Sequence, residues 1–169
     1  MNKYEREYEK HRSRVSEFCQ YFSSNILYRG ETHDYSKMLS PEKEMFKRFD
    51  LKDTEYGTDE YMERLEVMKK EGLNHHYASN RHHPEHFENG IRDMTLIDLV
   101  EMLCDWLSAM ERQGTVNIDE SLYYCKERFD IGDELYSILL NTVKEMKLVN
   151  QSTDMGKKYF KMHSHTKVS

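Results

Sequence analysis

The sequence predicts an all-α protein in which about six helices form one compact domain. Three observations support this: apolar residues recur at steps of three and four, only 2 prolines and 7 glycines interrupt 169 residues, and no long polar–apolar alternation is present. A chain of this length suits one domain with one core. We place the domain at residues 1–150 and expect residues 151–169 to form a flexible C-terminal tail, because periodicity is lost there.

The first helix is predicted by an apolar stripe near the start of the chain. Its members follow one another at steps of four and three, as on one face of an amphipathic helix: Tyr4, Tyr8, His11, Val15, Phe18, Phe22 and Ile26. Gly30 is a natural stop for this helix. His11 stands where the stripe calls for a core residue, so it is either a buried structural histidine or a ligand.

Capping residues mark the helices that follow. Ser40 and Pro41 predict a helix start, and that helix runs to about Phe49. Thr58 predicts a further start, and Gly72 then ends or bends the helix. Two C-terminal helices are expected at about residues 118–129 and 135–146, where apolar side chains again follow a helical period.

Thr95 can cap a strongly apolar helix from Leu96 to about Arg112. This helix is apolar around most of its circumference, which indicates burial. Its carboxylates Asp98, Glu101 and Asp105 lie within about 60° of one another, because they are spaced i, i+3 and i+7. Buried carboxylates require cations or a metal as partners. The acidic stripe therefore either faces water or lines a site, with Asp105 as its first candidate ligand.

Composition disfavours several classes of partner. The net charge of −6 argues against general nucleic-acid binding, although a bound metal could still attract a small anionic substrate. Cys19, Cys104 and Cys125 show no paired spacing, so we expect free thiols in a reducing cytoplasm. The charged first residues do not resemble a signal peptide, and no apolar run approaches the ~20 residues of a membrane span. A homo-oligomer stays open.

Histidine is the most informative residue type. Seven of the 9 histidines precede residue 87, and five of these fall between residues 75 and 86. Neutral imidazoles bind divalent transition metals, so this run indicates either a metal site or a solvated polar loop. The adjacent pair His33 and Asp34 offers two further ligand types and is followed at three residues by Lys37.

The order His11, His33-Asp34, the histidine run and Asp105 resembles the HD superfamily of metal-dependent phosphohydrolases. Segment 33–37, His-Asp-Tyr-Ser-Lys, is similar to that family's His-Asp-x-Gly-Lys signature, with serine in place of glycine. Segment 104–107, Cys-Asp-Trp-Leu, is similar to its closing small-Asp-x-Leu element. The histidines around Asn80 also resemble an uncharacterised bacterial and phage HD-like group. The resemblance covers roughly residues 8–110.

The resemblance implies an HD-like helical domain that binds one or two divalent ions, with Mn, Fe, Co, Ni, Zn and Mg all open. The metal ligands that it implies are His11, His33, Asp34, His76, His83 and Asp105. His75 and His82 are the substitutes, because either member of an adjacent pair could face the metal. His11, His33, Asp34 and Asp105 are then expected to converge, and side chains more than ~10 Å apart would contradict the HD arrangement, because ligands bind a shared metal at roughly 2 Å.

The resemblance further implies hydrolysis of a small phosphate ester such as a nucleotide. Lys37 would hold the phosphate oxygens, and Asp34 would bridge two metals or orient the attacking water. His75, His82 or Glu101 would transfer a proton to the leaving group. Two alternatives stay open: a diiron HD-type oxygenase, and a non-enzymatic protein with a structural metal site.

Overall fold

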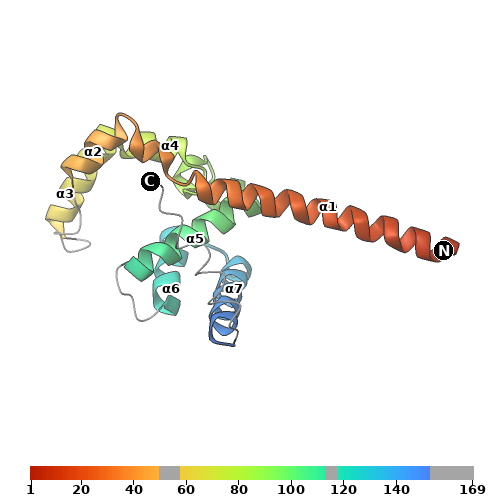
Figure 1. Ribbon diagram of the computed structural model, residues 1–169. Coiled ribbons are helices and arrows are strands. Elements are labelled where there is room, and N and C mark those ends of the chain that lie inside the picture. The colour runs from red at the N-terminus through yellow and green to blue at the C-terminus, as the bar shows by residue number, and fades with distance from the viewer. Residues whose placement is uncertain (50–57, 113–117, 153–169) are drawn as a thin grey trace. The chain divides into compact units, whose positions relative to one another are not determined.

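A computed structural model describes residues 1–49, 58–112 and 118–152 of the chain. All regular secondary structure in these residues is helical, which confirms the predicted all-α class (Figure 1). About six helices are predicted, and the described residues contain these α-helices: α1 Lys3–Glu31, α2 Glu42–Arg48, α3 Asp59–Met68, α4 Asn74–Ser79, α5 Leu96–Arg112, α6 Ile118–Arg128 and α7 Asp133–Ser152. Short 3₁₀ turns lie at Tyr35–Met38, Pro84–His86 and Gly90–Asp93.

The described residues form two units by internal contact, one over residues 1–108 and one from Ala109 onward. The second unit contains α6 and α7, and its buried apolar residues include Leu122, Leu139 and Val143. The predicted domain of residues 1–150 stays a prediction, and the predicted tail lies outside the described residues from position 153 on. No described helix is long and apolar enough to cross a membrane.

The ends of α1 and α3 follow from local capping chemistry. α1 opens with a capping box: Asn2 Oδ1 accepts from the Glu5 N–H, and the Glu5 carboxylate accepts from the Asn2 N–H. The helix continues one residue beyond Gly30, close to the predicted stop. At the start of α3, Thr58 Oγ1 accepts from the Tyr61 N–H at 3.2 Å, as its capping role predicts.

α5 begins at the predicted cap and buries its acidic side. The Thr95 N–H donates to Asp98 Oδ2 at 2.9 Å, and the Asp98 N–H donates to Thr95 Oγ1 at 3.2 Å. Asp98 and Glu101 are buried, as are Met102 and Leu103. The alternative of a solvated acidic stripe is therefore wrong for Asp98 and Glu101, whose charges must be compensated inside the protein.

A small apolar core lies between α2 and α3. Met45, Met68 and Leu73 are buried in it. The sequence predicts that Gly72 ends or bends its helix. In the structure α3 ends at Met68, and a π-helical turn that contains Gly72, Lys69–Leu73, leads into α4. At Gly72 an added Cβ would lie 3.1 Å from Met45 Cβ, so glycine permits a close approach here. The π turn leads the chain into the histidine segment, and such turns are frequent at functional sites.

We expect Gly72→Val to lower the free energy of unfolding by about 1–3 kcal/mol, because the new side chain must displace Met45. Urea or thermal unfolding of the two proteins measures the difference. Gly30→Val is the matched control, because nothing lies within 4 Å of a Cβ added at Gly30. Equal destabilisation by both substitutions would contradict the close packing of Gly72 on α2.

Candidate metal centre

Asp34 lies at the centre of the candidate site. It follows α1 and adopts a left-handed backbone conformation, φ 56° and ψ 21°, which aspartate tolerates better than most residues. Its Oδ1 lies 3.5 Å from Nε2 of both His76 and His82. Its Oδ2 lies 3.4 Å from His33 Nε2. The two carboxylate oxygens therefore face different histidines.

Two buried glutamates hold the rings of these histidines. Glu101 Oε1 accepts a hydrogen bond from His33 Nδ1 at 2.9 Å and lies 3.1 Å from His82 Nδ1. Glu42 Oε2 accepts from His76 Nδ1 at 2.8 Å. Because a carboxylate holds each ring at Nδ1, the Nε2 atom of each ring faces the centre of the site. A metal ion bound at Nε2 would take the place of any proton there.

Three overlapping groups of side chains bring their ligand atoms within 4.8 Å of one another. They are Asp34–His76–His82–His83, His33–Asp34–Asp105 and His33–His82–Glu101. The first two groups share Asp34, whose carboxylate could bridge two ions. In the third group, Glu101 Oε1 already contacts Nδ1 of both His33 and His82. Glu101 therefore fits the role of a residue that orients the candidate ligands better than that of a ligand.

The donor atoms at this centre fit a metal ion. Asp34 Oδ1 and His82 Nε2 are buried and hydrogen-bond to no described residue, although they lie 3.5 Å apart. An unpaired buried polar atom costs about 1–3 kcal/mol, and a cation between the two would satisfy both. His76 Nε2 and His83 Nε2 also face each other, at 2.8 Å. Imidazole nitrogen together with carboxylate oxygen suits divalent transition ions.

The ionisation of the site follows from these contacts. Hydrogen bonds to Asp105 and Glu101 raise the pKa of His33 to about 10. Burial, together with the neighbouring histidines, lowers the pKa of His83 to about 3. Burial alone would raise the pKa of Glu101, but hydrogen bonds from His33 and His82 hold it below its usual range. Glu101 is therefore ionised at neutral pH, and its role in proton transfer stays a prediction.

Arginine side chains compensate the buried carboxylates of α5. Arg29, in the last turn of α1, contacts Asp98 Oδ1 at 3.0 Å and also binds Glu101 Oε2. Arg81 donates two hydrogen bonds to Asp98, at 3.1 and 3.0 Å. Burial would raise the pKa of Asp98, but hydrogen bonds from Arg81, Thr95 and Arg29 lower it to about 2. This network fixes the end of α1 against α5.

The structure brings most of the predicted metal ligands together. The five that converge are His33, Asp34, His76, His83 and Asp105. His82, predicted as a substitute ligand and proton donor, also directs Nε2 into the site. His75 does not join a ligand group among the described residues: its Nδ1 bonds to Glu42 Oε1 at 2.7 Å, and its side chain is 49% exposed.

The prediction that His11 is a metal ligand is wrong. α1 continues without a break to Glu31, and the site lies beyond that end. At 1.5 Å per residue, His11 lies about 30 Å along the helix axis from Glu31. Its side chain is exposed. This separation exceeds ~10 Å, so the structure contradicts the four-way convergence that the HD resemblance implies.

Lys37 lies beside Asp34, as its spacing of three residues predicts. Its Nζ donates a hydrogen bond to Asp34 Oδ2 and lies 5.0 Å from the centre of the Phe46 ring. Lys37 is therefore a partner of the central carboxylate as well as the candidate phosphate contact.

Two residues that position the site, Glu42 and Arg29, are not predicted from the sequence. Glu42 is fully buried, and Ser36 Oγ donates to its Oε2 at 2.8 Å while accepting from Asn80 Nδ2 at 2.7 Å. Ser36, the departure from the HD signature, thus positions the glutamate that holds His76. An acid in the first turn of a helix and a base in the last turn are common, so neither Glu42 nor Arg29 stands out in the sequence.

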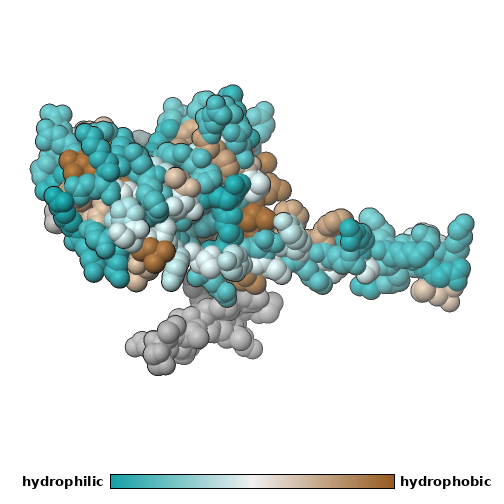
Figure 2. All heavy atoms as spheres, turned by 90° about the horizontal axis from the view of Figure 1, so that it is seen from above, coloured by the Kyte–Doolittle hydropathy of each residue, from teal (hydrophilic) through white to brown (hydrophobic). Residues whose placement is uncertain are grey.

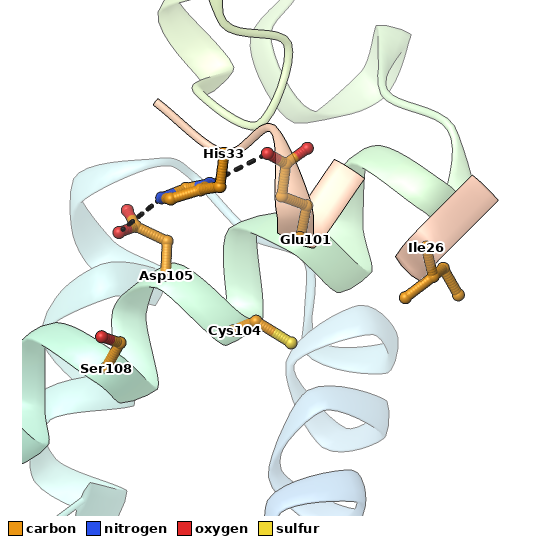
Figure 3. A pocket seen from close by; sticks show the side chains of 7 residues that line it. Ile26, His33, Glu101, Cys104, Asp105 and Ser108 are labelled. Carbon is orange, nitrogen blue, oxygen red and sulfur yellow. Dashed lines mark hydrogen bonds and ion pairs between the residues drawn. The ribbon is translucent and has the colours of Figure 1, made fainter. Parts of the chain in front are cut away.

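A pocket of about 210 Å³ opens beside the centre. It is lined by Ile26, Gly30, His33, Glu101, Cys104, Asp105 and Ser108. Figure 3 shows the His33 ring between the carboxylates of Asp105 and Glu101, with the Cys104 side chain directed away from them. The pocket therefore has an ionic edge at the candidate ligands His33 and Asp105 and a largely uncharged wall from α1 and α5.

One comparison with known proteins gives a match. Residues 1–153 match the family of unknown function DUF5662, and this stretch includes every residue of the candidate metal centre. No curated protein and no solved structure is detectably similar to the chain. On the extent of this match, the chain belongs to the family of unknown function DUF5662.

Proposed function

We propose that the protein is a metal-dependent phosphohydrolase that acts on a small phosphate ester. The observation that carries this proposal is the common orientation of His33, His76 and His82, each with Nδ1 at a buried glutamate and Nε2 toward Asp34. Carboxylates behind histidines fix the tautomer and the ring orientation at metal centres. A purely structural histidine is usually satisfied at both nitrogens, whereas His82 Nε2 is buried without a hydrogen bond.

The ligand groups divide naturally into two ion positions. His33, Asp34 and Asp105 would hold one ion, and Asp34, His76, His82 and His83 the other. Divalent ions in such a centre act as Lewis acids toward a phosphoryl oxygen and lower the pKa of a coordinated water.

The openness of the site favours catalysis over a structural metal. The side chains of His33 and Asp105 are 27% and 31% exposed, whereas those of His76 and His82 are each 2% exposed. The pocket begins at the two exposed ligands. Structural ions are usually enclosed by four protein ligands, while catalytic ions keep a position open. The organic part of a substrate would occupy this pocket.

The chain's own charged groups suit a phosphate ester. Lys37 is the cation nearest to Asp34 Oδ2 and would contact a phosphate oxygen at the same edge. Arg29 and Arg81 are already bound to α5 carboxylates, so they would position the ligands rather than the substrate. His83, neutral because burial lowers its pKa to about 3, suits a ligand and not a general acid.

We expect the protein to bind up to two divalent ions, with His76→Ala, His82→Ala and Asp105→Asn each losing at least one. Elemental analysis and calorimetric titration with Co²⁺ or Mn²⁺ measure this. Metal removal should lower Tm, because ligands from separate segments are assembled only in the folded chain. His11→Ala is the matched control and should keep all bound metal. Full metal content in His76→Ala and His82→Ala would contradict the proposed centre.

We expect the metal-loaded protein to release inorganic phosphate from members of a panel of nucleoside monophosphates and aryl phosphates. Lys37→Met should keep the metal and lower kcat/KM by about 10²–10³, the usual loss on removing one preorganised contact. Full activity in Lys37→Met would remove Lys37 from the mechanism. If the protein is inert to the whole panel but carries iron and consumes oxygen with an organic substrate, the diiron oxygenase alternative replaces hydrolysis.

We expect Gly30→Leu to fill the pocket and to lower kcat/KM for esters with a bulky organic group by about tenfold or more. Methyl phosphate should be affected less, because its organic group is small. The added side chain meets no atom within 4 Å of its Cβ, so the fold should persist. Ser24→Leu, an exposed change on the same helix, is the control. Equal kinetics for wild type and Gly30→Leu would place the substrate elsewhere.

A further inference from the structure

The apolar stripe of α1 is exposed from Tyr4 to Phe22. The side chains of Tyr4, Tyr8, Val15, Phe18 and Phe22 are 78%, 54%, 46%, 53% and 42% exposed. No residue of α1 is buried. Figure 2 shows apolar residues at intervals on an otherwise mostly hydrophilic surface of this helix. A continuous exposed stripe, unlike scattered apolar residues, marks an interaction surface.

The spacing of the stripe is that of a two-stranded coiled coil. Steps of four and three between Tyr4 and Phe22 put three residues at each core position of a heptad repeat. Tyr8, Val15 and Phe22 occupy position a, and Tyr4, His11 and Phe18 occupy position d. Position f, on the outer face, carries Arg6, Ser13 and Gln20. Tyr21 is also exposed and lies beside the seam at position g.

The exposed area is sufficient for a specific pair. Aromatic side chains bury about 150–250 Å² each, and four aromatic residues of the seam are roughly half exposed or more. Two α1 helices in contact would therefore remove on the order of 1,000 Å² of surface, the lower limit for a specific interface. Helices gain most of their stability from packing, so a 29-residue helix with no buried residue requires such a partner.

Charges beside the seam favour a parallel pair of identical helices. Glu7 and Arg14 occupy position g, and Arg12 occupies position e. In a parallel pair in register, Glu7 of each copy faces Arg12 of the other copy, which gives two opposite-charge contacts. In the antiparallel pair that keeps the same seam, Arg12 faces Arg12 and Arg14 faces Arg14. Within one chain these residues form only exposed helix-surface pairs, which can exchange partners.

We propose that residues 4–22 of α1 form a parallel two-stranded coiled coil with a second copy of this chain. The inference does not depend on the proposed catalytic function. The seam ends before Arg29 and His33, so each copy keeps its own complete centre.

Sedimentation or light scattering of the full chain tests the proposal. We expect a mass of twice 20.4 kDa at micromolar concentration. Phe18→Glu should give monomers, whereas Gln20→Glu, two residues away on the outer face, should stay dimeric. Tyr8→Glu provides a second variant farther from the metal centre, and a cooperative thermal unfolding transition verifies that each variant is folded. A monomeric wild type, or dimers of both seam variants, would overturn the proposal and indicate that another surface covers the stripe.

Cysteine cross-linking tests the orientation, in a Cys19→Ser background. In a parallel pair, Phe18→Cys places two thiols across the seam within reach of a disulfide, so oxidation should link the copies. Gln20→Cys should not be linked. Cross-linking only in a mixture of Tyr8→Cys and Phe18→Cys chains would show an antiparallel pair and overturn the parallel arrangement.

Discussion

The carboxylate of Glu101 is the contact on which the arrangement of the centre depends. It receives Arg29 from the last turn of α1, His33 from the turn that follows α1, and His82 from the histidine segment. A single buried group on α5 thus joins segments that are 68 and 72 residues away in sequence from it. An uncompensated charge at this depth would be strongly unfavourable, so these segments are held together by the need to keep Glu101 paired.

Glu42 repeats the same arrangement from the α2 side. It holds His76 and His75, and it is itself held by Ser36. Together the two glutamates orient rings from separate segments so that their Nε2 atoms face Asp34. The left-handed backbone conformation of Asp34 contributes to the same arrangement, because it turns the carboxylate into the space between the rings. The histidine orientation is therefore set by the protein itself, which is the preorganisation that a metal centre requires.

Local signals in the sequence predict much of this structure. Thr58 and Thr95 mark helix starts because a side-chain cap acts within three residues of itself. The spacing along α5 places Asp98, Glu101 and Asp105 on one side because helix geometry is regular. Glu42 could not be predicted as a positioning residue, because it meets His76 across 34 positions. The contact between Glu42 and His76 forms only in the folded chain, so no local sequence pattern indicates it.

His11 shows the limit of periodicity as evidence. A stripe with steps of three and four identifies the face of a helix that leaves water, but the same stripe serves a domain core and a coiled-coil seam. The two cases differ in the partner that covers the stripe. Because α1 is 29 residues long, most of the stripe lies far from the centre. Because helix formation is cooperative, a partner that orders residues 4–22 also favours helix at the other end. There Arg29 binds α5, and Ile26 and Gly30 line the pocket. The exposed stripe and the α1 residues that border the centre thus lie on one continuous helix, so a partner that orders the stripe would also support the position of Arg29.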